Sequence, residues 1–428
     1  MSGPAAREVA ARVFHAASPL RDRTAVYGTI VDVEGNVLDR GLALAMDGPR
    51  SATGEDVVEL HVHGSPVVVR ETLRALFHAG ARAAEPGEFT RRAFLHGKLD
   101  LTAAEAVADV IDAETHAAVR AANTNLGGAL RTEIDAIRAS LTGLLEELAG
   151  AIDYPDEVPE PEPAVVTARL AAADTRLAAL VQGWERGRLV REGVFVAIVG
   201  PPNAGKSSLL NALLGEERAI VADLPGTTRD TIEELLVIDG VPVRIVDTAG
   251  LRGTGDAIER QGIARAQRAL EEAAVALVVV DGSRRLDADA HEVLVRTRGR
   301  PRVVLFNKRD LGTAGYDARD PAEGDALCAS VREGTSLAAI RAGVAAAAWG
   351  GGPADFSRAH LASARHADAV ARAREALAHA ADTLAAGDPQ DLIAGDLVAA
   401  AAALGEITGA AVTEDVLAGI FARFCVGK

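Results

Sequence analysis

The chain has 428 residues, of which 49% are hydrophobic, 25% charged and 3% aromatic. This length is too great for one ordinary hydrophobic core and predicts two or three domains, while the composition excludes disordered and fibrous proteins. The formal net charge of −16 argues against a general binder of phosphate backbones, because such proteins carry a basic face; any contact with RNA must use a local patch.

The lengths of the apolar runs and the number of cysteines indicate the cellular location of the protein. The longest apolar run, residues 273–280, is much shorter than the roughly 18 residues that cross a bilayer, and the start lacks the charged-then-apolar pattern of a secretory signal. Cys328 and Cys425 are too few for a disulfide framework. Neither thiol has a metal-ligand neighbour at useful spacing. We expect a cytoplasmic protein that does not associate with membranes.

Lysine is rare in this chain. Four of the 45 basic residues are lysine, and the other 41 are arginine. A lysine that remains in such a composition indicates a site that needs a compact ammonium instead of a planar guanidinium, although random usage explains any single one about equally well. The candidates for ligand contacts are Lys98, Lys206, Lys308 and Lys428.

The first part of the chain reads as a small α+β domain. Short β-like runs at residues 26–33 and 57–62 accompany a helical stretch at 67–77, a mixture typical of α+β folds. From residue 101 the pattern changes to long, alanine-rich helices. Eight apolar residues there keep helical spacing: Leu130, Ile134, Ile137, Leu141, Leu144, Leu145, Leu148 and Ile152. We expect this stripe to pack against other helices.

A proline-rich break and a series of strands follow. Residues 153–163 read DYPDEVPEPEP, which predicts a loop or hinge. Four apolar strands then alternate with helices, the signature of a parallel sheet: residues 195–199, 243–246, 276–280 and 303–306. After residues 350–353 the chain returns to alanine-rich helix. The α/β unit is therefore predicted to be inserted between two halves of one helical domain, which cover each other.

A phosphate-binding loop follows the first of these strands. Residues 200–207 read GPPNAGKS and match the pattern G-x4-G-K-[ST] between a strand and a helix. The glycines allow backbone N–H groups to surround phosphate oxygens at a helix N-terminus, Lys206 reaches the β and γ phosphates, and the Ser207 hydroxyl binds Mg²⁺. The predicted contacts of this loop are Asn203, Ala204, Gly205, Lys206, Ser207 and Ser208.

Two further motifs follow later strands of the predicted sheet. The run DTAG at residues 247–250 supplies a carboxylate near Mg²⁺ and a glycine N–H that senses the γ-phosphate. The run NKRD at residues 307–310 selects guanine, because the Asp310 carboxylate accepts from N1–H and the exocyclic amine of that base. Each motif alone fits an ordinary turn, but their order and spacing predict a GTP site. Its further members are Asp247, Thr248, Ala249, Gly250, Asn307, Lys308, Asp310 and Ser330.

Three more positions bear on hydrolysis. Thr228, in the run GTTRD at residues 226–230, offers a hydroxyl that completes Mg²⁺ ligation when a switch loop closes, although a plain Gly-Thr turn fits the same residues. Ras-like proteins place a glutamine after DxxG to orient the attacking water, and Leu251 takes that place here. Glu259, on the helix predicted after the DTAG run, is the candidate for this task; read alone, it fits a solvated carboxylate as well.

The sequence resembles the tRNA-modification GTPases of the MnmE (TrmE) family over nearly the whole chain. The matching runs are TGEDVVELHVHG at 53–64, PGEFTRRAFLHGKLDL at 86–101, PPNAGKSSLLNALL at 201–214, PGTTRD at 225–230, DTAGLR at 247–252 and FCVGK at 424–428. With the element order, this implies a multidomain α+β and α/β fold. Its parts are an N-terminal α+β folate-binding and dimerisation domain (1–97), a discontinuous helical domain (98–192 and 353–428) and an inserted Ras-like P-loop GTPase domain (193–352).

The resemblance also implies an activity and partners. The family hydrolyses GTP with Mg²⁺ and K⁺ and acts as a homodimer. Together with an FAD-dependent MnmG-type protein, it installs a carboxymethylaminomethyl or aminomethyl substituent at C5 of the wobble uridine of tRNA. A 5-formyl or 5,10-methylene tetrahydrofolate supplies the one-carbon unit, and the FAD belongs to the partner.

Several residues of this chain match functional positions of the family. The expected K⁺ ligands are Asn203, Thr227 and the backbone near Ala222 and Leu224. Glu259 falls on the catalytic glutamate. The expected folate contacts are Glu59, Lys98 and Lys428. Cys425 falls on the cysteine of the family's tail, where the thiol serves the modification chemistry or is a small packing residue.

The start of the chain differs from the family. Members usually begin with a further segment that holds a Gly-rich loop, a first strand and a folate-contacting arginine, ahead of the Ser2-Gly3 pair. Either the start is misassigned or the segment is truly absent. A real loss would affect folate binding and the dimer interface and would leave the GTPase domain intact.

Two other classes of GTPase share parts of these patterns. Ribosome-assembly GTPases carry the same PNxGKS and DTAG motifs, but we expect those proteins to show a second GTPase domain or a basic RNA-binding domain after the first. This chain ends instead in acidic helices and FCVGK. A membrane-associated GTPase is disfavoured because the sequence lacks a basic amphipathic anchor.

Overall fold

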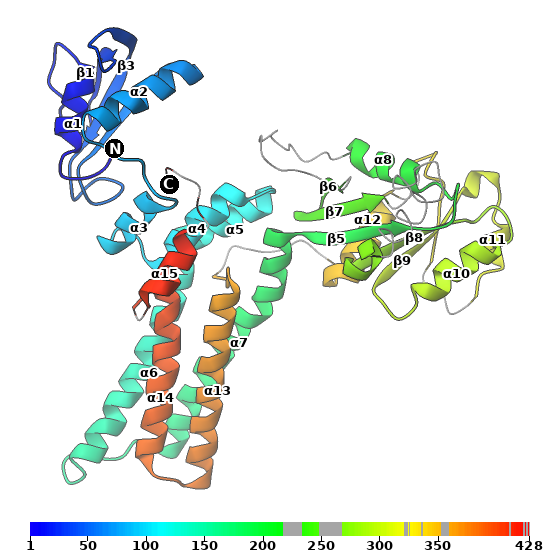
Figure 1. The fold of residues 1–428 in the computed structure, drawn as a ribbon. Coiled ribbons are helices and arrows are strands. Elements are labelled where there is room, and N and C mark those ends of the chain that lie inside the picture. Colours follow the sequence, from blue (N-terminus) through cyan, green and yellow to red (C-terminus); the bar gives the residue numbers. More distant parts are fainter. Residues whose placement is uncertain are drawn as a thin grey trace. The chain divides into compact units, whose positions relative to one another are not determined.

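The computed structural model of the chain describes most of its residues. The described ranges are 1–216, 233–247, 268–320, 324, 326–334, 337–351, 359–410, 412–422, 424 and 427. The chain forms two compact units. One consists of Met1–Ala108, Asn125–Thr175 and Asp368–Lys428, and the other of Asp109–Thr124 and Arg176–Ala367. Each unit contains one β-sheet (Figure 1). The four-part domain limits expected from the sequence stay a prediction.

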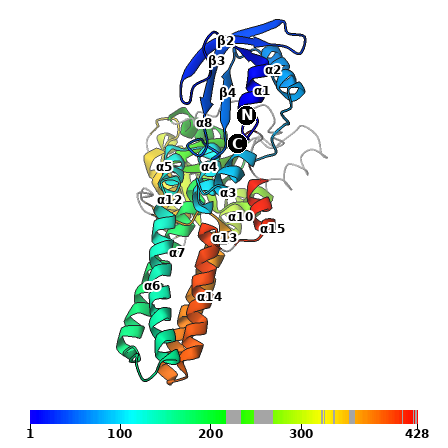
Figure 2. The same cartoon turned by 90° about the vertical axis from the view of Figure 1, so that its left-hand side faces the viewer.

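The first unit begins with a four-stranded antiparallel sheet of strand order β1-β2-β3-β4 (Figure 2). The strands are β1 (Phe14–His15), β2 (Ala25–Val31), β3 (Val37–Met46) and β4 (Val57–His61), and helices α1 (Ala6–Val13) and α2 (Pro66–His78) pack against the sheet. Buried residues alternate along the strands, as in Val26 and Ile30 of β2, because successive side chains point to opposite faces. The predicted strands at 26–33 and 57–62 and the helix at 67–77 are confirmed.

Helices make up the rest of the first unit, and the long ones run side by side (Figure 1). They are α3 (Glu88–Leu95), α4 (Leu101–Asp112), α5 (His116–Leu126), α6 (Ala129–Asp153), α7 (Pro163–Glu192), α13 (Ala364–Ala386), α14 (Gln390–Thr408) and α15 (Glu414–Phe421), of which α4, α5, α7 and α13 extend into the second unit. Helix α6 packs against α14, and Arg138 Nε donates to Ala401 O at 3.2 Å. Among the described helices, none is long and apolar enough to cross a membrane.

The predicted apolar stripe of α6 is largely correct. Leu130, Ile134, Ile137, Leu141, Leu144 and Leu148 are at most 1% exposed. Ile152, at the end of the helix, is 43% exposed, so the prediction that it belongs to the packed face is wrong. The reason is its position next to the Pro-rich break, where α6 ends at Asp153 and a helix terminus has fewer neighbours than its middle.

The second unit is built on a six-stranded sheet of order β10-β9-β8-β5-β7-β6. The strands are β5 (Val194–Val199), β6 (Glu233–Ile238), β7 (Val241–Asp247), β8 (Val275–Asp281), β9 (Arg302–Asn307) and β10 (Leu327–Cys328). Only the β6–β7 pair is antiparallel among these strands. Helices α8 (Lys206–Glu216) and α12 (Leu337–Trp349) share one core cluster with the sheet, and α10 (Ala288–Arg296) shares another.

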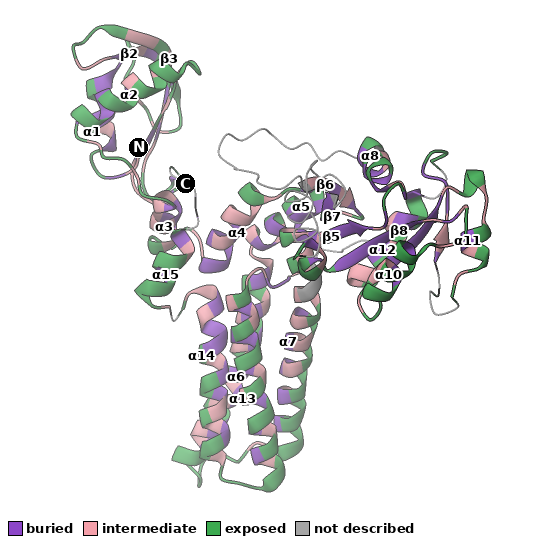
Figure 3. Cartoon of the chain, turned by 45° about the vertical axis from the view of Figure 1, so that its right-hand side comes forward, coloured by how far each residue is buried: buried purple, intermediate pink, exposed green. Residues whose placement is uncertain are grey.

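The central strands of this sheet are buried on both faces (Figure 3). This burial explains why the sequences of β8 and β9 contain continuous apolar runs. The four predicted strands are confirmed as β5, β7, β8 and β9. These four strands are parallel, so their carboxyl ends meet at one edge. In the registers, Ile198 lies opposite Asp247 and Asp281 opposite Asn307. The loops that carry the GTP motifs therefore begin at one edge of the sheet.

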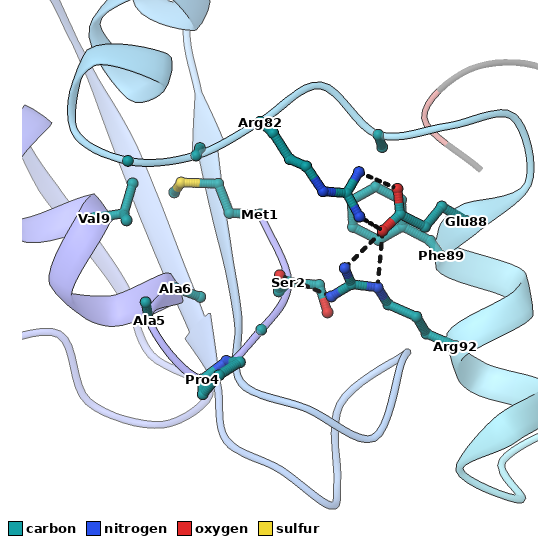
Figure 4. Close-up of a pocket in the computed structure, with 14 residues that line it drawn as sticks. Met1, Ser2, Pro4, Ala5, Ala6, Val9, Arg82, Glu88, Phe89 and Arg92 are labelled. Carbon is teal, nitrogen blue, oxygen red and sulfur yellow. Dashed lines mark hydrogen bonds and ion pairs between the residues drawn. The ribbon is translucent and has the colours of Figure 1, made fainter.

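A cavity of about 240 Å³ lies in the first unit beside α3 (Figure 4). Its polar wall is a network centred on Glu88. The Glu88 carboxylate accepts hydrogen bonds from Arg82 and from Arg92, the latter at 2.6 Å from Nη2. Arg92 Nη1 also donates to Glu55 Oε2 at 2.7 Å and to Ser2 O at 3.2 Å. The network ties α3 to the start of the chain and to the loop before β4.

The charge of Glu88 depends on these contacts. The hydrogen bond from Arg82 is the largest cause that lowers the pKa of Glu88 from 4.5 to about 2, with help from Glu85 N and Arg92 and against the opposing effect of burial. A lowered pKa of a carboxyl group contributes stability above its ordinary pKa, and that stability is lost as the pH falls through the lowered value.

We therefore predict that acid loosens α3. Between pH 4.5 and about pH 2, the protection of α3 amides against hydrogen exchange, corrected for intrinsic rates, should fall more steeply in the wild type than in Glu88→Gln. The variant lacks the group whose protonation costs stability. Parallel pH profiles in the two proteins would contradict the prediction.

Candidate nucleotide-binding site

Residues 200–205 form a compact loop between β5 and α8. Gly200 and Gly205 have φ of +155° and +101°, and Asn203 has φ of +60°, a left-handed conformation that asparagine tolerates better than most residues. A Cβ on Gly200 would lie 2.0 Å from Val279 O, and one on Gly205 would lie 2.3 Å from Asn307 Nδ2. Glycine at both positions therefore allows the loop to approach β8 and β9.

Lys206 is held inside this loop. The residue is 5% exposed, and its Nζ donates to Gly200 O at 2.8 Å and to Pro201 O at 2.7 Å. Lysine is seldom buried to this extent unless its ammonium has partners that offset the desolvation. Ser207 and Ser208 are exposed in the first turn of α8, where backbone N–H groups lack partners within the helix. The loop therefore combines a cation and N–H donors, the chemistry that binds phosphate.

Asn307, at the end of β9, joins the base motif to the phosphate loop. The residue is 4% exposed, its Nδ2 donates to Ala204 O at 2.9 Å, and its Oδ1 accepts from Val331 N at 3.1 Å. The sequence predicted Asn307 as a member of the guanine motif but not as this bridge. Ser330, the expected further base contact, is fully buried next to Val331, and its Oγ accepts from Glu333 N at 3.3 Å.

The remainder of the NKRD run turns toward solvent. Asp310 is exposed in the 3-10 turn Arg309–Leu311, so its carboxylate is accessible to a base. Lys308 pairs with Asp281 at 2.8 Å. Asp281 was not predicted from the sequence, where its signal is an acidic residue directly after the apolar run of β8.

Several predicted site residues lie outside the described part of the chain. They are Ala222, Leu224, Thr227, Thr228, Thr248, Ala249, Gly250, Glu259, Cys425 and Lys428. Asp247 is described as the last residue of β7. Among the described residues, no three His, Cys, Asp or Glu side chains form a metal-binding group. Such a group is not needed for Mg²⁺ in a nucleotide site, because phosphates and waters supply most of its ligands.

The two described folate candidates lie in the first unit. Glu59 is exposed on β4, with Oε2 3.2 Å from His61 Nε2. Lys98 is exposed after α3, and its Nζ donates to Pro49 O at 3.0 Å. Each side chain thus has a local partner and an accessible surface, and their role in folate binding stays a prediction.

We predict that Gly200→Ala weakens nucleotide binding. The added Cβ would collide with Val279 O, so the loop must move off the sheet, and the dissociation constant of GDP should rise at least about tenfold. Gly215→Ala is the matched control, because a Cβ there meets nothing within 4 Å and should stabilise α8 by up to about 1 kcal/mol. Calorimetric titration with GDP measures both. Wild-type affinity in Gly200→Ala would contradict this account of the loop.

Comparisons with known proteins relate the whole chain to one family. The family described as "MnmE helical domain" matches residues 101–425, and "GTP-binding protein TrmE N-terminus" matches residues 1–98. Proteins named tRNA modification GTPase MnmE from Chloroflexus aurantiacus and Symbiobacterium thermophilum are 43% and 45% identical, over 100% of this chain and 95% of each relative.

The similarity to a solved structure extends over a smaller part of this chain. Era of Aquifex aeolicus, bound to GDP·AlF4⁻, is 25% identical over 43% of this chain and 66% of that protein, with a TM-score of 0.30. The sequence matches extend over nearly every residue, including both compact units and the GTP motifs. On this ground the chain belongs to the MnmE (TrmE) family.

Proposed function

We propose that this chain hydrolyses GTP and acts in tRNA modification. The observation that carries the GTPase part is the hydrogen bond from Asn307 Nδ2 to Ala204 O, which joins a guanine motif to a phosphate-binding loop. Membership of a family whose relatives are named tRNA modification GTPases supports the tRNA part. A ribosome-assembly GTPase, the alternative reading of the motifs, is not supported by these whole-chain matches.

Different residues bind the phosphates, the base and Mg²⁺ in this proposal. Lys206 and the N–H groups at the start of α8 hold the β and γ phosphates. Asp310 accepts from N1–H and the exocyclic amine of guanine. Adenine has an acceptor at N1 and no amine at C2, so it cannot make these hydrogen bonds. Ser207, with Asp247 and Thr228, serves Mg²⁺, which neutralises charge on the phosphates.

Hydrolysis needs further charge compensation and an oriented water. In this proposal a K⁺ ion held by Asn203, Thr227 and the backbone of Ala222 and Leu224 supplies the positive charge that an arginine finger supplies elsewhere. Asn203 is exposed in the phosphate loop, so its amide oxygen is accessible to an ion. Leu251 cannot orient a water, and Glu259 takes that role.

The proposal also covers the partners of this chain and the folate-dependent modification of tRNA. The chain acts in the cytoplasm as a homodimer with an FAD-dependent MnmG-type protein on the wobble uridine of tRNA. Glu59, Lys98 and Lys428 bind a tetrahydrofolate in the domain of residues 1–97, and Cys425 serves the modification. The helical domain comprises 98–192 and 353–428, and the GTPase domain 193–352. With a net charge of −16, tRNA must be bound through a local basic patch.

Mass analysis of the wobble nucleoside tests the tRNA part. Cells that lack this chain should lose the C5 substituent, and the wild-type gene should restore it. Gly200→Ala should restore less of it, since GTP binding is weakened, while Gly215→Ala should restore it in full. An unchanged nucleoside in the deletion strain would refute the tRNA role and leave GTP hydrolysis standing.

Potassium should accelerate GTP hydrolysis more than sodium does. We expect the rate in K⁺ to exceed the rate in Na⁺ at least about tenfold, because a fixed cation offsets charge that develops in the transition state. Asn203→Ala should remove this difference, whereas Asn123→Ala, which changes an exposed asparagine of α5, should keep it. Phosphate release measured in the two salts tests the acceleration by K⁺. Equal wild-type rates in K⁺ and Na⁺ would exclude the potassium mechanism.

A further inference from the structure

An acidic residue at the end of β8 lies beside the guanine motif. Asp281 Oδ2 accepts a hydrogen bond from Lys308 Nζ at 2.8 Å. Asp281 Oδ1 accepts from Ser283 N at 3.0 Å and from Ser283 Oγ at 2.6 Å. The side chains of Asp281 and Lys308 are 15% and 28% exposed. Water therefore reaches the pair only in part, and the charge-assisted hydrogen bond between them is stronger than one at the open surface.

Backbone contacts fix the two loops that carry this pair. Gly282 N donates to Asn307 O at 2.8 Å, and Gly315 N donates to Gly282 O at 2.9 Å. A Cβ on Gly315 would lie 2.3 Å from Arg284 O. Because the loops after β8 and β9 pack this closely, Asp281 cannot move away from Lys308 without disturbing both.

Lys308 has a backbone conformation that needs support. Its φ is +66°, in the left-handed region that residues with a Cβ rarely adopt. This turn separates Asn307, whose amide binds the phosphate loop, from Asp310, which is exposed. The conformation of Lys308 therefore determines how the two functional ends of the motif are placed relative to each other.

We infer that Asp281 is a positioning residue of the guanine site and acts through Lys308. The inference rests on the proposed GTPase function and deepens it. The Asp281 carboxylate holds the Lys308 ammonium, and with it the turn from Asn307 to Asp310, in the arrangement that receives the base. The base is bound alike before and during hydrolysis, so the loss of this support weakens the binding of substrate and transition state equally.

Asp281→Asn tests the inference, because it removes the charge and nearly keeps the shape. Burial raises the pKa of Asp281, but the hydrogen bonds from Lys308 and Ser283 outweigh it and hold that pKa below 3.8, so the wild-type group is charged at neutral pH. We expect the dissociation constant of GDP and the KM for GTP to rise about tenfold each and kcat to stay within about twofold.

Arg284→Ala is the matched control. Arg284 Nε lies 3.5 Å from the same carboxylate oxygen, but its side chain is 66% exposed, so its removal should leave GDP affinity within about twofold of the wild type. A circular dichroism melt that is alike for both variants shows that the sheet is intact.

A double-mutant cycle separates positioning from a merely structural role. In a Lys308→Ala background, Asp281→Asn should have no further effect on GDP affinity, since the group through which it acts is gone. Unchanged GDP affinity in Asp281→Asn alone, or an equal loss of affinity in both backgrounds, would overturn the inference. In either case, GDP binding by the wild-type chain would still support the proposed function. A wild-type chain that binds no GDP would overturn both.

Discussion

The nucleotide site depends on one buried side chain that holds two distant segments together. Asn307 and Ala204 are 103 residues apart in the chain, and the amide of one donates to the carbonyl of the other. The phosphate-binding loop follows β5 and the guanine motif follows β9. The two form one site only if these loops keep a fixed distance from each other. An unpaired buried amide costs about 1–3 kcal/mol. The bridge therefore resists opening and keeps the two parts in register.

The parallel sheet makes this bridge possible. Asp281 and Asn307 lie opposite each other where β8 and β9 end, and Gly200 follows β5 close against Val279. The loops approach one another more closely than residues with a Cβ allow, and the glycines permit it. The described part of the site is thus held in place by contacts within the protein itself, and such contacts lower the cost of ordering a site on binding.

Much of the fold could be predicted from residue patterns. Strands β5, β8 and β9 contain unbroken apolar runs, residues 241–246 of β7 are apolar apart from exposed Arg244, and the stripe of α6 has clear helical spacing. Strand β3 (Val37–Met46) was missed, because Asp39, Arg40 and Gly41 interrupt its apolar residues. Ile152 was wrongly placed in the packed face, since its spacing is helical but the helix ends beside it. Periodicity shows which face is apolar and does not show where a partner helix stops.

The GTP motifs were visible because their residues are close in sequence. The contacts of Asn307 with Ala204 and of Lys308 with Asp281 were not, because they join loops that meet only in the folded sheet. Of the lysines singled out by their scarcity, Lys206 is buried in the phosphate loop and Lys308 is paired with Asp281, and their contacts with a ligand stay predictions. Lys98, by contrast, is exposed and donates to a carbonyl.

Competition between nucleotides examines base selection by Asp310 together with phosphate binding by Lys206. We expect GTP to displace bound GDP at least about a hundredfold more effectively than ATP does, because adenine leaves the Asp310 carboxylate without donors. Equal displacement by ATP and GTP, or no binding of either nucleotide, would contradict this expectation.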